Sequence, residues 1–455
     1  MLDKHPFSYW IHRLSPSQLL LLFYLLAIIV SSITLSLPIS YQEGKIVPFI
    51  DILFTTVSAL TVTGLSTISI VDTFSTTGLV FLTVIMHLGA VGVMAIGTTI
   101  WIVLGKKIGI SERILIMQDQ NQTTFGGMVR LIKQILAVLF IVETISVLIM
   151  GTYFLRYFSS VSEAYFHGFF TTITAISNTG FSLDNDSLAL YSQDYFIQMV
   201  VMLLIIFGAI GFPVLIEVKH YLLSWKNRKR IFRFSLFTKV TTTTFFALVI
   251  LGTLNIYLID MNGFFKGKSW HEGLFYALFQ SVATRSGGLS TMDIGLLSEA
   301  NHLFMSSLMF IGASPSSAGG GIRTTTFALV AIFILTFARG GKRLKVFNRE
   351  IHDEDIMKAV TVMIMAIVFV FTSLLIIMIV EPYSVTSLLL EITSAFGTAG
   401  LSLGLTSELT TFSKVILMIL MFIGRIGIVT FLYMFRKTIT NDSYIRYPKE
   451  RIMIG

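Results

Sequence analysis

Four short runs of small and polar residues contain the groups best suited to chemistry in this chain. They align without gaps and share Ala, four variable residues, Gly, then Leu or Phe, and Ser. A dehydrated cation must replace its lost hydration shell with other oxygens, and rings of backbone carbonyls can supply them. Glycine permits the positive φ angles that turn successive carbonyls toward one axis. The four runs are residues 58–66, 174–182, 282–290 and 394–402.

We predict that one segment of each run lines a cation selectivity filter around a common axis. The short helices before these segments would aim their partly negative C-terminal ends at the axis, which favours a cation. The alternative is four re-entrant turns in which glycine serves only close packing. The candidate filter residues are Thr61, Val62, Thr63 and Gly64; Ser177, Asn178, Thr179 and Gly180; Arg285, Ser286, Gly287 and Gly288; and Gly397, Thr398, Ala399 and Gly400.

A second marker follows each run at a similar distance. Three of the four units have Gly-x-x-Gly there, and the third has Gly-Ala-Ser-Pro. One such tetrapeptide is weak evidence, because small residues commonly allow helices to pack in membranes. Two markers in register in all four units indicate a fourfold internal repeat. The second markers are residues 89–92, 208–211, 312–315 and 424–427.

The composition places these repeats in a membrane. Hydrophobic residues make up 54% of the 455 residues, charged residues 13%, and the mean hydropathy is +0.81. Soluble proteins carry about 25% charged residues. This deficit excludes a soluble enzyme, a disordered chain and a nucleic-acid binder, despite a net charge of +8. The absence of cysteine excludes disulfides and thiolate metal sites.

Eight apolar stretches are long enough to cross a bilayer. Each unit then reads as helix, short re-entrant helix, glycine-containing loop and helix. We therefore predict an all-α membrane protein, with four pseudo-symmetric helix–pore-loop–helix repeats around one central, potassium-channel-like pore. The predicted crossings are residues 18–37, 78–104, 135–154, 197–218, 241–259, 303–311 continued by 324–337, 359–380 and 415–435.

Basic residues set the predicted orientation. Most of the 33 Lys and Arg residues fall in five segments on one side, and the positive-inside rule makes that side cytoplasmic. Both termini would then be cytoplasmic, in a multi-pass protein of the bacterial cell membrane. The predicted parts are the N-terminus 1–17, repeats at 18–104, 135–226, 240–338 and 359–436, cytoplasmic loops at 105–134, 227–239 and 339–358, and the tail 437–455.

The sequence predicts that the second crossing of the third repeat is interrupted, and it predicts this in no other repeat. A proline and three consecutive glycines cannot continue a stable helix. We predict that residues 313–321 form a loop at mid-membrane depth that obstructs the path below the filter; the alternative is a permanent kink. The candidate gate residues are Ser314, Pro315, Ser316, Ser317, Ala318, Gly319, Gly320, Gly321 and, from the last crossing, Arg425.

Two arginines need partners at membrane depth. We expect Arg285 to point behind the filter and donate to carbonyls or to a carboxylate, with Glu391 and Asp51 as candidates. We expect Arg425 to face the pore, contact the hydroxyls or carbonyls of the gate loop and raise a barrier to cations. The alternative for Arg425 is a structural contact between helices.

The four loops, residues 314–325 and the Gly-Arg-Ile-Gly run at 424–427 resemble the Trk/Ktr/HKT superfamily of potassium transporters, and within it the membrane subunit of bacterial Ktr systems. The resemblance implies channel-like potassium uptake by a homodimer with one pore per protomer. It also implies a cytosolic, octameric RCK-type ring (KtrA/KtrC-like) that binds ATP or ADP, with no cofactor in this chain. Sodium activation is known in the family. Ala313, Ser316 and Ile428 depart from residues common in it.

Competing functions remain at this point. An ion-coupled (sodium or proton) potassium symporter is the main alternative, although few acidic residues occupy the crossings. A voltage-gated channel would need a row of spaced arginines in one helix. A non-conducting scaffold would leave the filter-like loops unexplained, and no nucleophile–base or metal constellation favours an enzyme.

Overall fold

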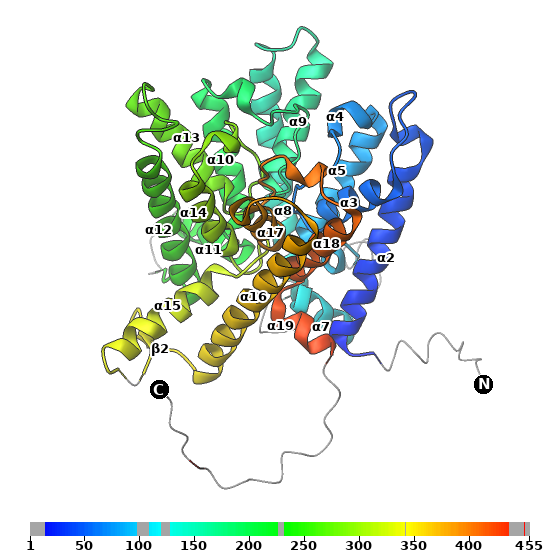
Figure 1. The fold of residues 1–455 in the computed structure, drawn as a ribbon. Coiled ribbons are helices and arrows are strands. Elements are labelled where there is room, and N and C mark those ends of the chain that lie inside the picture. Colours follow the sequence, from blue (N-terminus) through cyan, green and yellow to red (C-terminus); the bar gives the residue numbers. More distant parts are fainter. Residues whose placement is uncertain are drawn as a thin grey trace, which may run out of the picture.

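The computed structural model describes residues 14–97, 109–119, 128–225, 232–341, 343–435 and 450. Within these residues the chain is almost entirely helical (Figure 1). The one sheet in the described part of the chain is a two-stranded antiparallel hairpin of β1 (Lys345–Val346) and β2 (Arg349–Glu350). This agrees with the all-α architecture that the sequence predicts.

Each repeat begins with a long apolar helix. All four of these helices are long and apolar enough to cross a membrane. Serine caps start two of them. At the first, the Ser15 hydroxyl accepts from the Gln18 amide and the Gln18 side chain accepts from the Ser15 amide, which is a capping box. At the third, the Ser235 hydroxyl accepts from the Thr238 amide. The four helices are α2 (Pro16–Ser36), α8 (Met128–Phe154), α12 (Leu236–Ile259) and α16 (Asp353–Val380).

A shorter, more buried helix follows each long one. In these helices the residues of the last two turns are almost all buried, so each C-terminal end lies inside the protein. They match the short re-entrant helices predicted before each glycine-containing loop. The four pore helices are α3 (Phe49–Leu60), α9 (Val161–Ile176), α13 (Trp270–Ala283) and α17 (Val385–Gly397).

The second crossing of every repeat is broken. The sequence predicts a break only in the third repeat, and this is wrong: the chain bends by 107° between α10 and α11 and by 104° between α18 and α19. The cause is the second glycine of each Gly-x-x-Gly, since Gly92, Gly211 and Gly427 have φ of 97°, 99° and 92° and cannot continue a helix. The first halves are α5 (Thr76–Val91), α10 (Tyr195–Ala209), α14 (Glu299–Phe310) and α18 (Thr411–Ile426); the second halves are residues 93–97, α11 (Phe212–Trp225), α15 (Thr324–Ala338) and α19 (Ile428–Met434).

Smaller elements complete the fold. The hairpin between α15 and α16 packs through Leu344 and Val346 onto Val240 of α12 and Ile356 of α16. The helix α7, within the predicted cytoplasmic loop 105–134, buries Leu115 against the core. The remaining elements are η1 (Pro38–Ser40), α4 (Ile70–Thr73), α7 (Ile110–Asp119), η2 (Ala189–Tyr191), η3 (Ile294–Leu296) and η4 (Leu405–Ser407).

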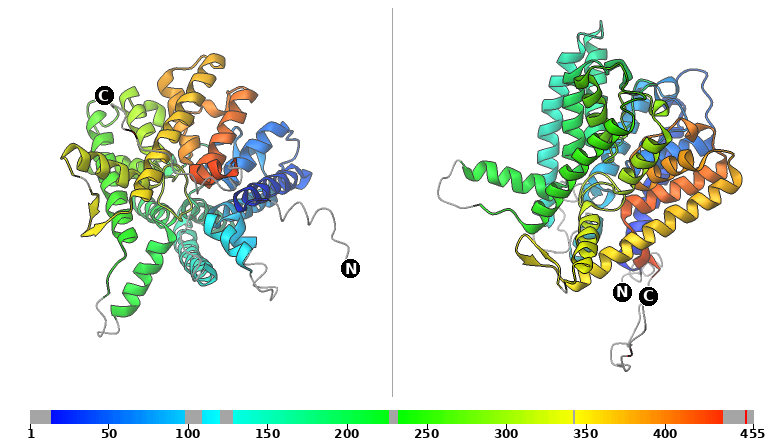
Figure 2. Two further views of the ribbon diagram at one scale, coloured as in Figure 1. Left: turned by 90° about the horizontal axis from the view of Figure 1, so that it is seen from below. Right: turned by 60° about the vertical axis from the view of Figure 1, so that its left-hand side comes forward.

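The repeats follow one another around the middle of the molecule. Viewed from below, the chain passes in order from blue through cyan and green to orange and red, and returns beside its start (Figure 2). Contacts of α3 with α18 and of α2 with α19 join the first repeat to the fourth. The long helices turn apolar residues such as Ile33, Leu254 and Phe371 outward, as expected of helices facing hydrocarbon.

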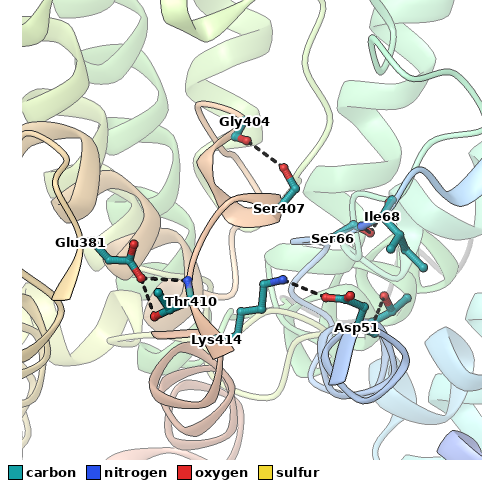
Figure 3. Close-up of polar contacts among 9 residues, drawn as sticks. Asp51, Ser66, Ile68, Glu381, Gly404, Ser407, Thr410 and Lys414 are labelled. Atoms are coloured by element: carbon teal, nitrogen blue, oxygen red, sulfur yellow. Dashed lines mark hydrogen bonds and ion pairs between the residues drawn. The ribbon is translucent and has the colours of Figure 1, made fainter. Parts of the chain in front are cut away.

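A buried ion pair fastens this junction of first and last repeats. The Lys414 ammonium at the start of α18 lies 2.9 Å from the Asp51 carboxylate in the first turn of α3 (Figure 3). Both residues are at most 9% exposed. The N-terminus of α18 is also held by Glu381, which accepts from the amide and hydroxyl of Thr410. An ion pair therefore links the first and fourth repeats, which are not joined to each other by a short loop.

We predict that Lys414→Met destabilises the protein by roughly 3–5 kcal/mol, because it leaves the Asp51 carboxylate buried without a counter-charge. The double variant Asp51→Asn/Lys414→Met should recover most of the loss. The measurement is unfolding of the purified protein in detergent. Lys358→Met is the matched control, because the Lys358–Asp355 pair is exposed and should matter little. A double variant as unstable as Lys414→Met would contradict this role.

A candidate ion pathway

The four predicted filter segments lie at the buried C-terminal ends of the pore helices. Thr61, Thr179, Ser286 and Thr398 are fully buried, and each lies within three residues of the end of its pore helix. Because helix C-terminal ends carry partial negative charge, four of them in one place favour a cation.

The same backbone conformation recurs in every repeat. Each shared glycine has positive φ, and so does the residue two positions before it. A non-glycine residue in this region costs about 1–2 kcal/mol, so four such residues at equivalent positions indicate a conformation imposed by the surrounding structure. The φ angles are 60° and 90° at Val62 and Gly64, 58° and 82° at Asn178 and Gly180, 75° and 67° at Ser286 and Gly288, and 47° and 85° at Thr398 and Gly400.

The four shared glycines lie close together. Each one packs against a backbone carbonyl of the following repeat, namely that of the residue just before the glycine of that repeat. A Cβ atom built on Gly64 would overlap the Thr179 oxygen, and one built on Gly400 would overlap the Thr63 oxygen. The other two contacts have the same pattern, so the ring runs through the repeats in chain order and closes on itself. They join Gly180 to the Gly287 oxygen and Gly288 to the Ala399 oxygen, at 3.2 and 3.0 Å from the added Cβ atoms.

Local hydrogen bonds hold these carbonyls in place. The Thr63 amide donates to the Ser58 oxygen at 2.8 Å, and the equivalent bonds of Thr179 and Ala399 measure 3.0 and 2.8 Å. The third repeat differs, because the Gly287 amide donates to the Ala283 oxygen instead. The symmetry is therefore approximate, as the differing loop sequences predict.

Arg285 lies behind this ring and donates to the carbonyls of Leu308 and Gly312. Its fully buried guanidinium also lies over the Phe245 ring, 5.7 Å from the centroid. Neither suggested carboxylate pairs with it in the described structure. Glu391 instead accepts from the Ser402 and Thr406 hydroxyls, and Asp51 pairs with Lys414, as described above. A sequence cannot choose among such partners, because carbonyl and carboxylate oxygens can both accept from a guanidinium.

Two hollows adjoin the ring on the side of the loops that follow the glycines. Their volumes are about 380 and 160 Å³, and all four glycines border one or the other. Nearby, hydrogen bonds from the Ser69 hydroxyl and the Asn185 amide lower the pKa of Asp72. An ionised carboxylate beside this mouth attracts cations toward the ring.

Residues 311–323, which we call the interrupting loop, separate α14 from α15 and contact three other repeats. The amides of Ser314 and Ala318 donate to the Ala209 and Gly208 oxygens at 3.0 and 2.9 Å. The Gly321 amide donates to the Gly424 oxygen at 3.1 Å. The loop thus bonds to the helix breaks of the second and fourth repeats.

The interrupting loop also touches the filter segments directly. The Gly320 amide donates to the Thr398 hydroxyl at 2.6 Å. A Cβ atom on Gly319 would lie 2.6 Å from the Ser286 side chain. Ala318 packs in one small cluster with Val62 of the first repeat. In this conformation the loop fills the space next to the ring.

Arg425 links the interrupting loop to the first repeat. Its guanidinium donates to the carbonyls of Ser317 and Ala318 and to those of Gly89 and Ala90. The side chain therefore makes both contacts that the sequence left as alternatives: one to the predicted gate and one between helices.

Sequence reasoning missed Arg323 as a second clamp on the loop. Its guanidinium donates to the Gly319 carbonyl and to the Arg425 carbonyl. Its position two residues after three consecutive glycines was the available signal, because an arginine next to such a loop needs acceptors when it is buried. The sequence predicted Thr398 only as a filter residue. It did not predict that the Thr398 hydroxyl accepts a hydrogen bond from the Gly320 amide of the loop.

Known proteins resemble the chain over nearly its full length. It is 52% identical to the Ktr system potassium uptake protein D of Bacillus subtilis (strain 168), over 99% of both chains. It is 36% identical to the Ktr system potassium uptake protein B of the same organism, over 100% of both chains. The crystal structure of the potassium transporter TrkH from Vibrio parahaemolyticus has a similar fold. Its TM-score is 0.71 at 17% identity, over 96% of this chain and 87% of that one.

The TrkH family of cation transport proteins matches residues 23–447. This match covers all four filter segments, the interrupting loop and Arg425. By this match and its close relatives, the chain is a transporter rather than an enzyme, and it belongs to the TrkH family of cation transport proteins.

Proposed function

We propose that this chain is the membrane-embedded subunit of a potassium uptake system and that potassium crosses through the four filter segments. The observation that carries the proposal is the closed ring of glycines and carbonyls, in which each repeat contributes one residue pair. Backbone oxygens can replace the hydration shell of potassium without adding charge. The names of the two Bacillus subtilis relatives, both potassium uptake proteins, support the choice of ion.

The driving force is the membrane potential. It contributes about 2.3 kcal/mol per elementary charge for every 100 mV, so downhill flow through a channel-like path can accumulate potassium. Carbonyl ligands fit such a path, because they bind a cation without a proton or a second ion having to move.

The interrupting loop is the gate of this path. It bonds to the Thr398 hydroxyl beside the ring and is held by the guanidinium groups of Arg425 and Arg323. Because those contacts are mostly to loop carbonyls, opening requires the loop to exchange them for other partners. Two cationic groups next to the path also disfavour a potassium ion while the loop stays in place.

A cytosolic partner controls the gate in this proposal. The partner is an octameric RCK-type ring that binds ATP or ADP, the membrane subunit is a homodimer, and both termini are cytoplasmic. The words "Ktr system" in the names of the relatives support a multi-subunit assembly. Exposed Arg343, Lys345 and Arg349 on the hairpin offer a basic docking face, and α15 connects that hairpin to the interrupting loop.

The test is rubidium uptake into liposomes that contain the purified chain, with an imposed inside-negative potential. We expect uptake that follows the potential and needs neither a sodium nor a proton gradient. An added nucleotide-binding ring should change its rate, and sodium added at equal concentration on both sides tests activation. Uptake that requires a sodium gradient, with labelled sodium moving in fixed proportion, would instead indicate a symporter.

We predict that Gly64→Ser lowers the preference for potassium over sodium by about tenfold, or ~1.4 kcal/mol of discrimination. The new side chain would overlap the Thr179 carbonyl in the ring and shift it. Competition of sodium against rubidium uptake measures the preference. Gly44→Ser is the matched control, because Gly44 also has positive φ (78°) but nothing lies within 4 Å of an added Cβ. Equal selectivity in the Gly64 variant and the wild type would refute the filter assignment.

We predict that shortening residues 316–321 raises rubidium flux and weakens its dependence on the cytosolic ring, because the obstruction and its bonds are lost. Arg425→Gln is the milder variant: it removes the charged donor to Ser317 and Ala318, and its flux should rise several-fold. Arg339→Gln, at an exposed arginine after α15, is the control and should leave flux unchanged. Flux at or below the wild-type rate in both folded variants would mean that the loop is no gate.

A further inference from the structure

An apolar cavity of about 340 Å³ lies between helices α14, α15, α16 and α17. It opens past Ile367 and Phe371 of α16, which are 53% and 58% exposed. Since α16 is one of the helices long and apolar enough to span a membrane, this opening faces hydrocarbon. The cavity is therefore a side pocket of the protein at membrane depth, separate from the proposed ion path.

The pocket offers water few hydrogen-bond partners, because its hydroxyl protons are already used and only hydroxyl lone pairs are left to accept. Its only side-chain polar atoms are the hydroxyls of Ser306, Ser307 and Thr393. Each donates to a carbonyl of its own helix, four residues back, at 2.7, 3.1 and 2.7 Å. A buried water needs two to four polar partners, so this space favours an apolar occupant.

The volume suits a chain of carbon atoms. An apolar cavity of ~150 Å³ accepts one benzene molecule, so 340 Å³ holds about a dozen carbons. The bilayer next to the opening supplies chains of that kind at very high concentration.

We propose that this pocket binds the end of a lipid acyl chain and that an occupied pocket holds the interrupting loop in place. The second part rests on the proposed gating function; the first does not. A second copy of this chain is the alternative occupant. A small apolar hollow fits a single acyl chain better than it fits the broad, flat surface of another protein.

The coupling follows from which residues line the pocket. Phe310 precedes the interrupting loop, Ile311 is its first residue, and Phe327 follows it by one turn of α15. The Phe310 carbonyl accepts from the Ile322 amide at 3.4 Å, and its ring lies 5.7 Å from that of Phe396. The pocket is therefore lined by the start of the loop and by the first turns of the helix that follows it. A chain in the pocket fills the space into which these side chains would have to move when the loop leaves.

The opposite wall belongs to the fourth pore helix. Leu389 and Thr393 of α17 line the pocket, and the residue after this helix is Thr398, whose hydroxyl accepts from the Gly320 amide. An occupant thus packs against the start of the interrupting loop and against the pore helix that leads to Thr398.

The test uses the full chain in phosphatidylcholine liposomes that contain a small fraction of phosphatidylcholine with a diazirine at the end of one acyl chain. Photolysis followed by peptide mass spectrometry locates the label. We expect enrichment on α14 and α16 at the pocket walls. Two filling variants, Ile367→Trp and Ser307→Phe, should each lower that label at least fivefold. Having two variants protects the test if one of them folds poorly.

Val368→Trp is the matched control, because Val368 neighbours Ile367 on α16, is 47% exposed and does not line the pocket. It should keep the label. Equal labelling of wild type and filling variants would mean an ordinary lipid-facing surface and would overturn the pocket. Cross-links between two copies at the pocket walls would also overturn it, in favour of a second copy.

Rubidium flux tests the coupling separately. A bulky side chain that fills the pocket should imitate the occupant and lower flux several-fold, whereas Val368→Trp should not. If the filling variants lose the label but keep their flux, the pocket binds a lipid chain but does not influence the interrupting loop. Absence of flux in wild type and control alike would instead count against the proposed function.

Discussion

A polar backbone inside a membrane must have every donor and acceptor satisfied, and this constraint shapes the whole structure. An ion path needs free backbone oxygens, and only interrupted helices provide them. The chain therefore interrupts its helices at defined points, and hydrogen bonds from other repeats satisfy several of the groups that are released. Four pore helices end at the centre, and two residues of positive φ after each turn the carbonyls toward the neighbouring repeat.

The breaks in the second crossings serve the same constraint. Each lies at the second glycine of a Gly-x-x-Gly, and each leaves carbonyls of the preceding turn without a helical partner. Those carbonyls accept from the interrupting loop and from Arg425: Gly208 from the Ala318 amide, Gly424 from the Gly321 amide, and Gly89 from the Arg425 guanidinium. The Gly-x-x-Gly motif of the first, second and fourth repeats thus supplies the carbonyls that bind the interrupting loop and Arg425.

The sequence was sufficient for features that repeat and insufficient for features that depend on one contact. Gap-free alignment predicts the four pore loops, because equivalent residues take equivalent backbone conformations. The bends at Gly211 and Gly427 were missed, since a glycine is compatible with close helix packing and with a break alike. The Asp51–Lys414 pair and the clamp by Arg323 were also missed. They join residues far apart in the chain, and nothing local in the sequence selects such partners.

The central claim is that four backbone carbonyls coordinate a dehydrated monovalent cation. Anomalous diffraction from crystals grown in rubidium or thallium tests it most directly. The account predicts an anomalous peak on the axis among the carbonyl oxygens of Thr63, Thr179, Gly287 and Ala399, at coordination distance from all four repeats. An ordered peak held by side-chain carboxylates elsewhere, with the space among these carbonyls empty, would contradict it.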